Sequence, residues 1–149
     1  MKLALITNMI PPYRDILFSE IEKNKYIEEF CVYSFSKNEP NRRWLEDNKK
    51  EYRNIKSSGF SLVIGNKINP IRILHFHPNI ILGILRKRPD RVILGDVSIT
   101  KYICLLVFYI FQIKTILWYE DSRKLNEVNQ ISRFIKSILY KIPYKYITP

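Results

Sequence analysis

Short apolar runs alternate with segments of helical periodicity along most of this sequence. The runs are rich in aliphatic, aromatic and β-branched residues, which is typical of strands buried on both faces. They lie at residues 2–7, 29–35, 91–94 and 114–119, with briefer candidates at 52–55, 60–64 and 144–147. Helices are expected at about 16–27, 80–88, 98–112 and 130–141. This alternation predicts an α/β protein built on a doubly wound, mainly parallel sheet.

The residues between these elements give more local expectations. Asp15 is placed to cap the first helix with its carboxylate. The turn residues at 57–59 allow the run at 60–64 to be either a strand or a hairpin partner. The stretch from Asn69 to Pro78 is expected to be a helix or a loop, because proline opens and closes it.

The longest apolar stretch, residues 103–119, admits two interpretations. A membrane span needs about 20 apolar residues without charge near its middle, whereas this stretch is shorter and is interrupted by Gln112 and Lys114. A buried helix followed directly by a buried strand accounts for the same residues. The length argument favours the helix and strand.

Length and charge narrow the function. A chain of 149 residues is the size of one domain. Lys and Arg number 25 against 14 Asp and Glu, a formal charge of +11, which would attract nucleic acid, an anionic membrane or a phosphate-bearing substrate. Coding bias toward lysine is the alternative, and it would scatter the charge. No helix carries Arg and Asn spaced along one face, so nucleic acid is not the expected partner.

The cysteines and the amino terminus indicate the compartment. Cys31 and Cys104 both lie inside apolar runs, so we expect buried free thiols in a reducing environment. Residues 2–7 are too short for the apolar core of a signal peptide. A cytoplasmic location is therefore expected, with peripheral attachment to the inner membrane face as an option.

Several site types have little or no support in the sequence. His75 and His77 flank Phe76 without a nearby carboxylate or cysteine, so no metal site is predicted. Phosphate-binding, dinucleotide-binding, serine-hydrolase and zinc-protease motifs do not occur in the sequence.

In a doubly wound sheet, ligands bind beyond the carboxyl ends of the strands. The segments that follow strands here are 8–14, 36–43, 95–98 and 120–123. Arg14 could grip a phosphate, or be a solvated arginine at a helix end. Asp96 could accept hydrogen bonds from sugar hydroxyls, or cap the next helix. Arg43, beside Arg42 and Trp44, could steer a phosphorylated acceptor or sit against a membrane interface, or it could belong to a solvated loop.

A second cluster of polar and aromatic residues follows the strand at 114–119. Trp118 offers an aromatic face on which a sugar ring could stack. Glu120 and Asp121 could bind hydroxyls or take a proton from an attacking acceptor oxygen, which makes them the candidate catalytic residues. Helix capping and an ion pair to Arg123 are the structural alternative.

Four passages in sequence order resemble the first domain of bacterial family 4 glycosyltransferases of the GT-B type. They are LITNMIPPYRDILFSEI at the start, ILRKRPDRVILGD in the middle, KTILWYED, and RFIKSILYKIPYKYITP at the end. The resemblance implies a Rossmann-like, acceptor-binding N-terminal domain that ends before the donor-binding domain. It also implies a nucleotide-sugar donor held by that second domain, no metal cofactor, and a polysaccharide or lipid-linked acceptor.

The first loop departs from the family pattern. Many relatives carry a Gly-Gly pair whose backbone approaches the donor diphosphate, whereas this chain has Pro11 and Pro12. Proline has no N–H to donate, so a phosphate contact must come from Tyr13 or Arg14. The residues expected to contact the acceptor are therefore Asn8, Pro12, Tyr13, Arg14, Arg43, Asp96 and Trp118. The domain alone is expected to be inactive, and a basic α/β module that binds nucleic acid or a protein is the alternative.

Overall fold

The computed structural model describes residues 1–36, 50–64, 72–95, 98–118, 137 and 141–147. Its centre is a six-stranded sheet with the order β3-β2-β1-β6-β7-β8. The strands are β1 (Lys2–Thr7), β2 (Glu29–Ser34), β3 (Arg53–Lys56), β6 (Arg91–Gly95), β7 (Lys114–Trp118) and β8 (Lys145–Ile147). Every neighbouring pair is parallel. The doubly wound α/β fold expected from the sequence is confirmed.

The order of the strands reverses at β1. From β1 the chain moves outward to β2 and β3, and it then returns to the other side of β1 to form β6, β7 and β8. Such a switch point is where doubly wound sheets open a crevice for ligands, beyond the carboxyl ends of the strands. In this protein that place lies beyond the ends of β1 and β6, where a ligand crevice is expected, and we refer to it as the crevice.

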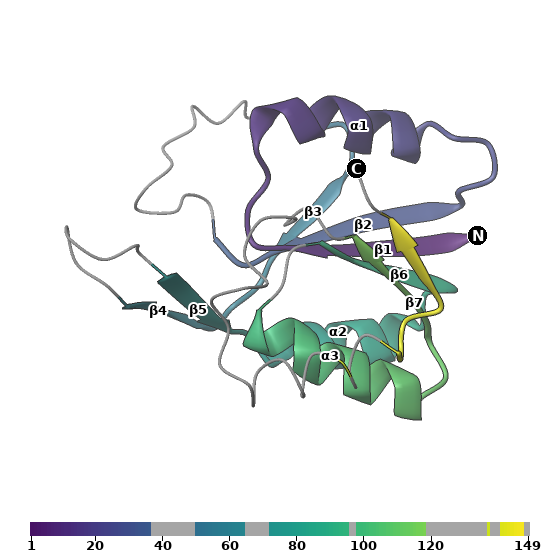
Figure 1. Ribbon diagram of the computed structural model, residues 1–149. Helices are drawn as coiled ribbons and strands as arrows, with labels where there is room; N and C mark the ends of the chain where they lie inside the picture. The colour runs from purple at the N-terminus through teal and green to yellow at the C-terminus, as the bar shows by residue number, and fades with distance from the viewer. Residues whose placement is uncertain (37–49, 65–71, 96–97, 119–136, 138–140, 148–149) are drawn as a thin grey trace.

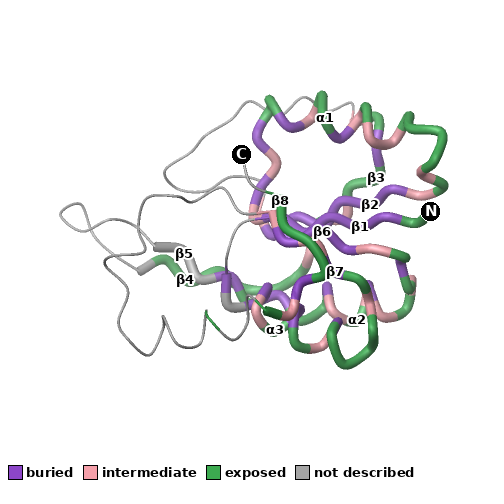
Figure 2. The backbone as a smooth tube through the Cα atoms, turned by 45° about the vertical axis from the view of Figure 1, so that its right-hand side comes forward, coloured by how far each residue is buried: buried purple, intermediate pink, exposed green. Residues whose placement is uncertain are grey.

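Helices cover both faces of the sheet. Helix α1 (Pro12–Glu22) lies on one face, and α2 (Asn79–Lys87) and α3 (Ile99–Ile110) lie on the other, as Figure 1 shows. Side chains alternate along β1, so that Leu3 and Leu5 join the apolar cluster under α1 while Ala4 and Ile6 join the cluster under α2 and α3. Strands β1, β2 and β6 are accordingly buried after their first residues, which is visible in Figure 2.

A hairpin outside the main sheet corrects one expectation. Strand β4 (Phe60–Ile64) pairs antiparallel with β5 (Arg72–Phe76), where the sequence led us to expect a helix or a loop before Pro78. The segment at 72–76, RILHF, has only one β-branched residue, and pairing with β4 makes it a strand. The hairpin projects from the end of the molecule at which the parallel strands terminate (Figure 1).

The helix starts also differ in detail from expectation. Helix α1 begins at Pro12 with Pro11 as its cap and no capping side chain, so the expected capping by Asp15 is wrong. Proline suits the first helical turn because its missing N–H would have no intrahelical partner there. Asp15 instead accepts a hydrogen bond from the Tyr52 hydroxyl. Helix α3 is capped by Ser98, since the Ser98 hydroxyl accepts from the Lys101 N–H at 3.4 Å.

The long apolar stretch is a helix followed by a strand, as the length argument predicted. Helix α3 ends at Ile110, and β7 starts at Lys114 after Gln112 adopts a left-handed φ of 56°. Among the described residues, none of the helices has the length and apolar character to span a membrane. Cys31 and Cys104 are buried and free, and burial raises the pKa of the Cys104 thiol to about 12. The helix expected at about 130–141 lies largely outside the described residues.

Candidate functional site

Arg14 is buried at the mouth of the crevice. It lies in the first turn of α1, where only 5% of its surface is exposed. Its Nη1 donates to the Thr7 hydroxyl at 3.4 Å, which ties it to the end of β1. Its guanidinium lies 4.7 Å from the centroid of the Trp118 ring, at the end of β7. The alternative of a solvated helix-end arginine is therefore wrong.

Tyr13 completes an aromatic surface around this cation. The guanidinium of Arg14 lies 5.9 Å from the Tyr13 ring, and the Tyr13 side chain is 62% exposed. Cation–π contact with the two rings holds the guanidinium in place. The structure thus brings Trp118 to Tyr13 and Arg14, more than 100 residues earlier in the sequence, as expected from the convergence of the strand ends.

A second buried cation contacts the same crevice from the opposite face of the sheet. Lys101 lies in the first turn of α3 and is only 1% exposed. Its ammonium donates to the Asn8 side-chain oxygen at 3.0 Å and to the carbonyl of Gly95. It also lies 5.3 Å from the Phe35 ring. Burying an ammonium is costly unless it is hydrogen-bonded, and this one is held by the ends of β1 and β6.

The two cations contact adjacent residues at the switch point. Arg14 reaches Thr7 from the α1 side, and Lys101 reaches Asn8 from the α3 side. Positive charge thus flanks the carboxyl end of β1 from both faces, which suits the binding of an anionic group just beyond it.

Two histidines dock the hairpin beside this site. His75 Nδ1 lies 2.7 Å from the Ser61 hydroxyl, and His77 Nδ1 lies 3.2 Å from the Ser57 hydroxyl. The His77 ring stacks on Phe35 with centroids 4.7 Å apart. Burial, and then the proximity of His75, lower the pKa of His77. The lowered pKa favours a neutral His77 ring as the partner of the Ser57 hydroxyl.

Threonine at the start of α3 fastens the hairpin to the helix. The Thr100 hydroxyl donates to the carbonyl of His75, and it accepts from the His77 N–H at 3.3 Å. Because Lys101 is the next residue, the docking of the hairpin and the position of the buried ammonium are set by the same helical turn.

The remaining predicted site residues are distributed as follows. Pro12 is exposed as the first residue of α1, and Asn8 and Trp118 are half-buried at the ends of β1 and β7. The other predicted residues, Arg43, Asp96, Glu120 and Asp121, lie outside the described residues, so their roles stay predictions.

No protein-family model matches the chain, and no curated protein matches it in sequence. The fold is similar to that of the UDP-GlcNAc 2-epimerase from Methanocaldococcus jannaschii. The two structures share 15% sequence identity at a TM-score of 0.54, over 100% of this chain and 39% of that chain. The chain thus spans about two fifths of that enzyme's length. The similarity supports the Rossmann-like, GT-B-type fold expected from the sequence.

Lys101 is the residue of this site that the sequence interpretation missed. Its signal was present, because it is the only charged residue in the helical sequence ITKYICLLVFYI. A lone lysine one turn into an otherwise apolar helix lies either on the solvent side or at a buried polar site, and sequence periodicity does not separate the two.

Proposed function

We propose that this chain is the acceptor-side half of a GT-B-type glycosyltransferase that uses a nucleotide-sugar donor. The acceptor would be a polysaccharide or a lipid-linked, phosphate-bearing saccharide. The observation that carries the proposal is the pair of buried cations at the switch point. Arg14 and Lys101 flank the end of β1, and the Trp118 ring lies beside Arg14.

The chemistry of the crevice fits an anionic sugar ligand. A planar guanidinium can bind two phosphate oxygens at once, and its contact with Trp118 fixes its orientation before the ligand arrives. The exposed face of Tyr13 offers a surface on which the C–H groups of a sugar ring can pack. The backbone at Pro11 and Pro12 lacks N–H donors, so side chains must supply the anion contacts.

The catalytic assignment extends the predictions made from sequence. Glu120 and Asp121 follow Trp118 by two and three residues, so an extended chain separates them from Trp118 by at most about 7 and 11 Å. We propose that one of them accepts the proton of the attacking acceptor hydroxyl. The donor sugar would be held by a second domain, so we expect no sugar transfer by this chain alone.

Ligand binding by the chain tests the proposal directly. Trp118 and Trp44 are its two tryptophans, so a Trp44→Phe background leaves Trp118 as the single indole reporter beside Arg14. Titration with a short-chain polyprenyl phosphate should change Trp118 fluorescence. Arg14→Gln should weaken binding about tenfold to a hundredfold, since hydrogen bonds to charged groups contribute about 1.5–3 kcal/mol.

The controls separate this proposal from its rival. Arg53→Gln removes an exposed arginine on β3 and should leave the affinity unchanged. Duplex DNA at the same phosphate concentration should bind more weakly than the polyprenyl phosphate. Tighter binding of DNA, with no effect of Arg14→Gln, would replace the glycosyltransferase proposal with a nucleic-acid-binding module.

A further inference from the structure

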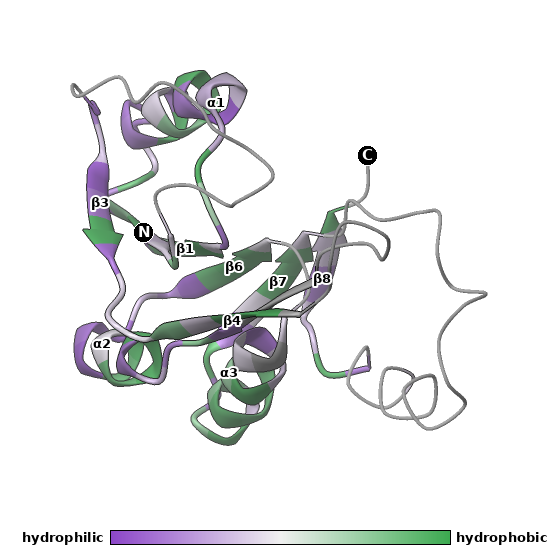
Figure 3. Ribbon diagram, turned by 90° about the vertical axis from the view of Figure 1, so that its left-hand side faces the viewer, coloured by the Kyte–Doolittle hydropathy of each residue, from purple (hydrophilic) through white to green (hydrophobic). Residues whose placement is uncertain are grey.

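Helix α3 presents an apolar surface on the side that faces away from the sheet. Its inner side packs into the core through Cys104, Leu105 and Phe108. Its outer side is also apolar, with Ile110 72% exposed and Phe111, just after the helix, 57% exposed. The hydropathy colouring of Figure 3 shows the helix hydrophobic around most of its circumference. A helix apolar all round is normally covered on all sides, so this surface is expected to meet a partner.

The outer surface comprises five exposed apolar residues at helical spacing. They are Ile103, Leu106, Tyr109, Ile110 and Phe111.

The helical layer around this surface carries positive charge and no negative charge. The sequences of α2, NIILGILRK, and α3, ITKYICLLVFYI, contain no acidic residue. On α2, Lys87 is paired with Glu29 of β2 at 2.6 Å, but Arg86 is exposed on the outer side. The partner must therefore tolerate or prefer cationic surroundings.

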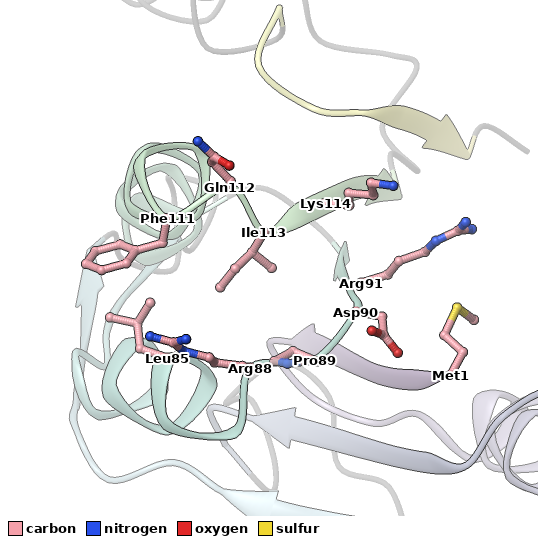
Figure 4. A pocket seen from close by; sticks show the side chains of 10 residues that line it. All are labelled: Met1, Leu85, Arg88, Pro89, Asp90, Arg91, Phe111, Gln112, Ile113 and Lys114. Carbon is pink, nitrogen blue, oxygen red and sulfur yellow. The ribbon is translucent and has the colours of Figure 1, made fainter.

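A basic pocket adjoins the apolar surface at Phe111. It has a volume of about 590 Å³ and lies at the amino-terminal end of the sheet, opposite the crevice. Figure 4 shows the three cations that line it, Arg88, Arg91 and Lys114, with Asp90 among them. Phe111 lines the pocket and is also part of the exposed apolar surface, so the two features are continuous.

The charge of the pocket favours one anionic group. The side chains of Arg88, Arg91, Lys114 and Asp90 leave a formal charge of +2, and the amino-terminal ammonium of Met1, which also lines the pocket, raises it to +3. The carboxyl-terminal ends of α2 and α3 meet here and contribute about half a negative charge each, which leaves roughly +2. Asp90 is partly satisfied already, because its carboxylate accepts from the Lys2 N–H at 2.6 Å. The positive charge that remains attracts a phosphate group.

We propose that α3 and this pocket form a docking surface for an anionic phospholipid bilayer. The outer apolar residues of α3 enter the boundary between headgroups and acyl chains, with the helix lying in the plane of the interface. Arg88, Arg91 and Lys114 receive a lipid phosphate at the end of the helix. The surface is separate from the sugar crevice, so the inference does not depend on the proposed function.

Charge argues for a bilayer over a second copy of this chain. A symmetric dimer through α3 would face one acid-free, cationic surface with another, and like charges across an interface are repulsive. An anionic bilayer complements both features, because its apolar interior matches the outer surface of α3 and its negative surface matches the basic pocket.

Vesicle co-sedimentation of the full chain tests the docking surface. We expect binding to phosphatidylcholine vesicles that contain phosphatidylglycerol, and much weaker binding to phosphatidylcholine alone. Ile110→Asp should lower the membrane partition constant by about tenfold or more, because it removes an isoleucine side chain that would be buried in the bilayer and places a carboxylate at the interface. The double variant Arg91→Gln, Lys114→Gln should lower it about thirtyfold, given the attraction of each cation to an anionic surface.

Ile16→Asp is the matched control. Ile16 is 74% exposed against 72% for Ile110, but it lies on α1, across the sheet from α3. This variant should bind vesicles as the unaltered chain does, and circular dichroism should show the same fold for all variants.

Four results would overturn the docking surface. They are equal binding to neutral and anionic vesicles, an equal loss in Ile16→Asp, unaltered binding by Ile110→Asp, and dimerisation in sedimentation velocity that Ile110→Asp abolishes. Millimolar inorganic phosphate distinguishes the two sources of anion. If it displaces the chain from vesicles completely, the pocket binds free phosphate and the bilayer is not its ligand.

Discussion

Acid should weaken the docking of the hairpin in the pH range just below 6.5, in which histidine is the side chain that titrates. The sequence contains two histidines, His75 and His77, and both lie in the buried cluster between β5 and α3. Burial, and secondarily His75, lower the pKa of His77 from its ordinary value of 6.5. The unfolded chain therefore binds a proton at His77 at a pH where the folded chain does not.

The sign and size of the effect follow from proton linkage. Because the folded-state pKa is the lower one, the unfolded state holds more protons between that pKa and 6.5. The contribution of His77 to the free energy of unfolding is therefore fully present above pH 6.5. It declines as the pH falls from 6.5 toward the pKa of His77 in the folded chain. The limiting slope for one histidine is about 1.4 kcal/mol per pH unit, a tenfold change in the folding equilibrium. Carboxylates titrate lower, near pH 4, and leave most of this window clear.

Urea unfolding followed by circular dichroism between pH 5.3 and 7.5 measures the slope. His77→Phe keeps an aromatic ring against Phe35 but removes the titrating nitrogens that face Ser57 and Ser61. Its free energy of unfolding should be lower at neutral pH and flatter below pH 6.5. The reasoning fails if the unaltered chain shows no slope in this window, or if His77→Phe retains the full slope.

Further predictions concern the buried lysine and two glycines. Lys101→Met should weaken binding of a phosphate-bearing ligand about thirtyfold, because a charge roughly 8 Å from a phosphate contributes about 2 kcal/mol at an effective dielectric constant near 20. Fluorescence titration measures the affinity, with Lys56→Met at an exposed site as the control. An unchanged affinity together with a lowered melting temperature would show that Lys101 has only a structural role. Gly59→Ala should destabilise the chain by about 1–3 kcal/mol, since its Cβ would lie 2.5 Å from the Phe76 carbonyl oxygen. Gly83→Ala on α2 should instead stabilise it by about 0.5–1 kcal/mol, since its Cβ would meet Tyr33 at an ordinary 3.5 Å. Thermal unfolding distinguishes these outcomes, and the same sign for both glycines would contradict them.

Part of the candidate site was accessible from the sequence. The rule that strand ends converge placed Tyr13, Arg14 and Trp118 in one crevice before any coordinates, and the structure brings them within cation–π distance. Whether Arg14 would be solvated could not be predicted, because that depends on Trp118, which arrives from more than 100 residues further along the chain. Burial is a property of the packed sheet and not of the helix end.

Lys101 and the hairpin show more clearly what could not be predicted from the sequence. Strand β5 is a strand only because β4 lies beside it. His75 in β5 and His77 just after it are buried only because Thr100 and Phe35 lie against them. Local propensity carries no information about such partners. The outer surface of α3 is a related case. The apolar sequence of the helix predicts burial on all sides, whereas the exposed fractions of its side chains show that one side is exposed.

The sequence by itself determined the class of fold, because the periods of apolar residues specify strands and helices, and their alternation permits few topologies. It also determined that the thiols would be buried and that the long apolar stretch would divide into helix and strand. The tertiary structure alone decided which polar groups meet, since Arg14 and Lys101 acquire their partners from strands and helices that are remote in sequence. The physical reason is that periodicity acts over a few residues, whereas burial and hydrogen bonding at a switch point are settled by chain segments that only packing brings together.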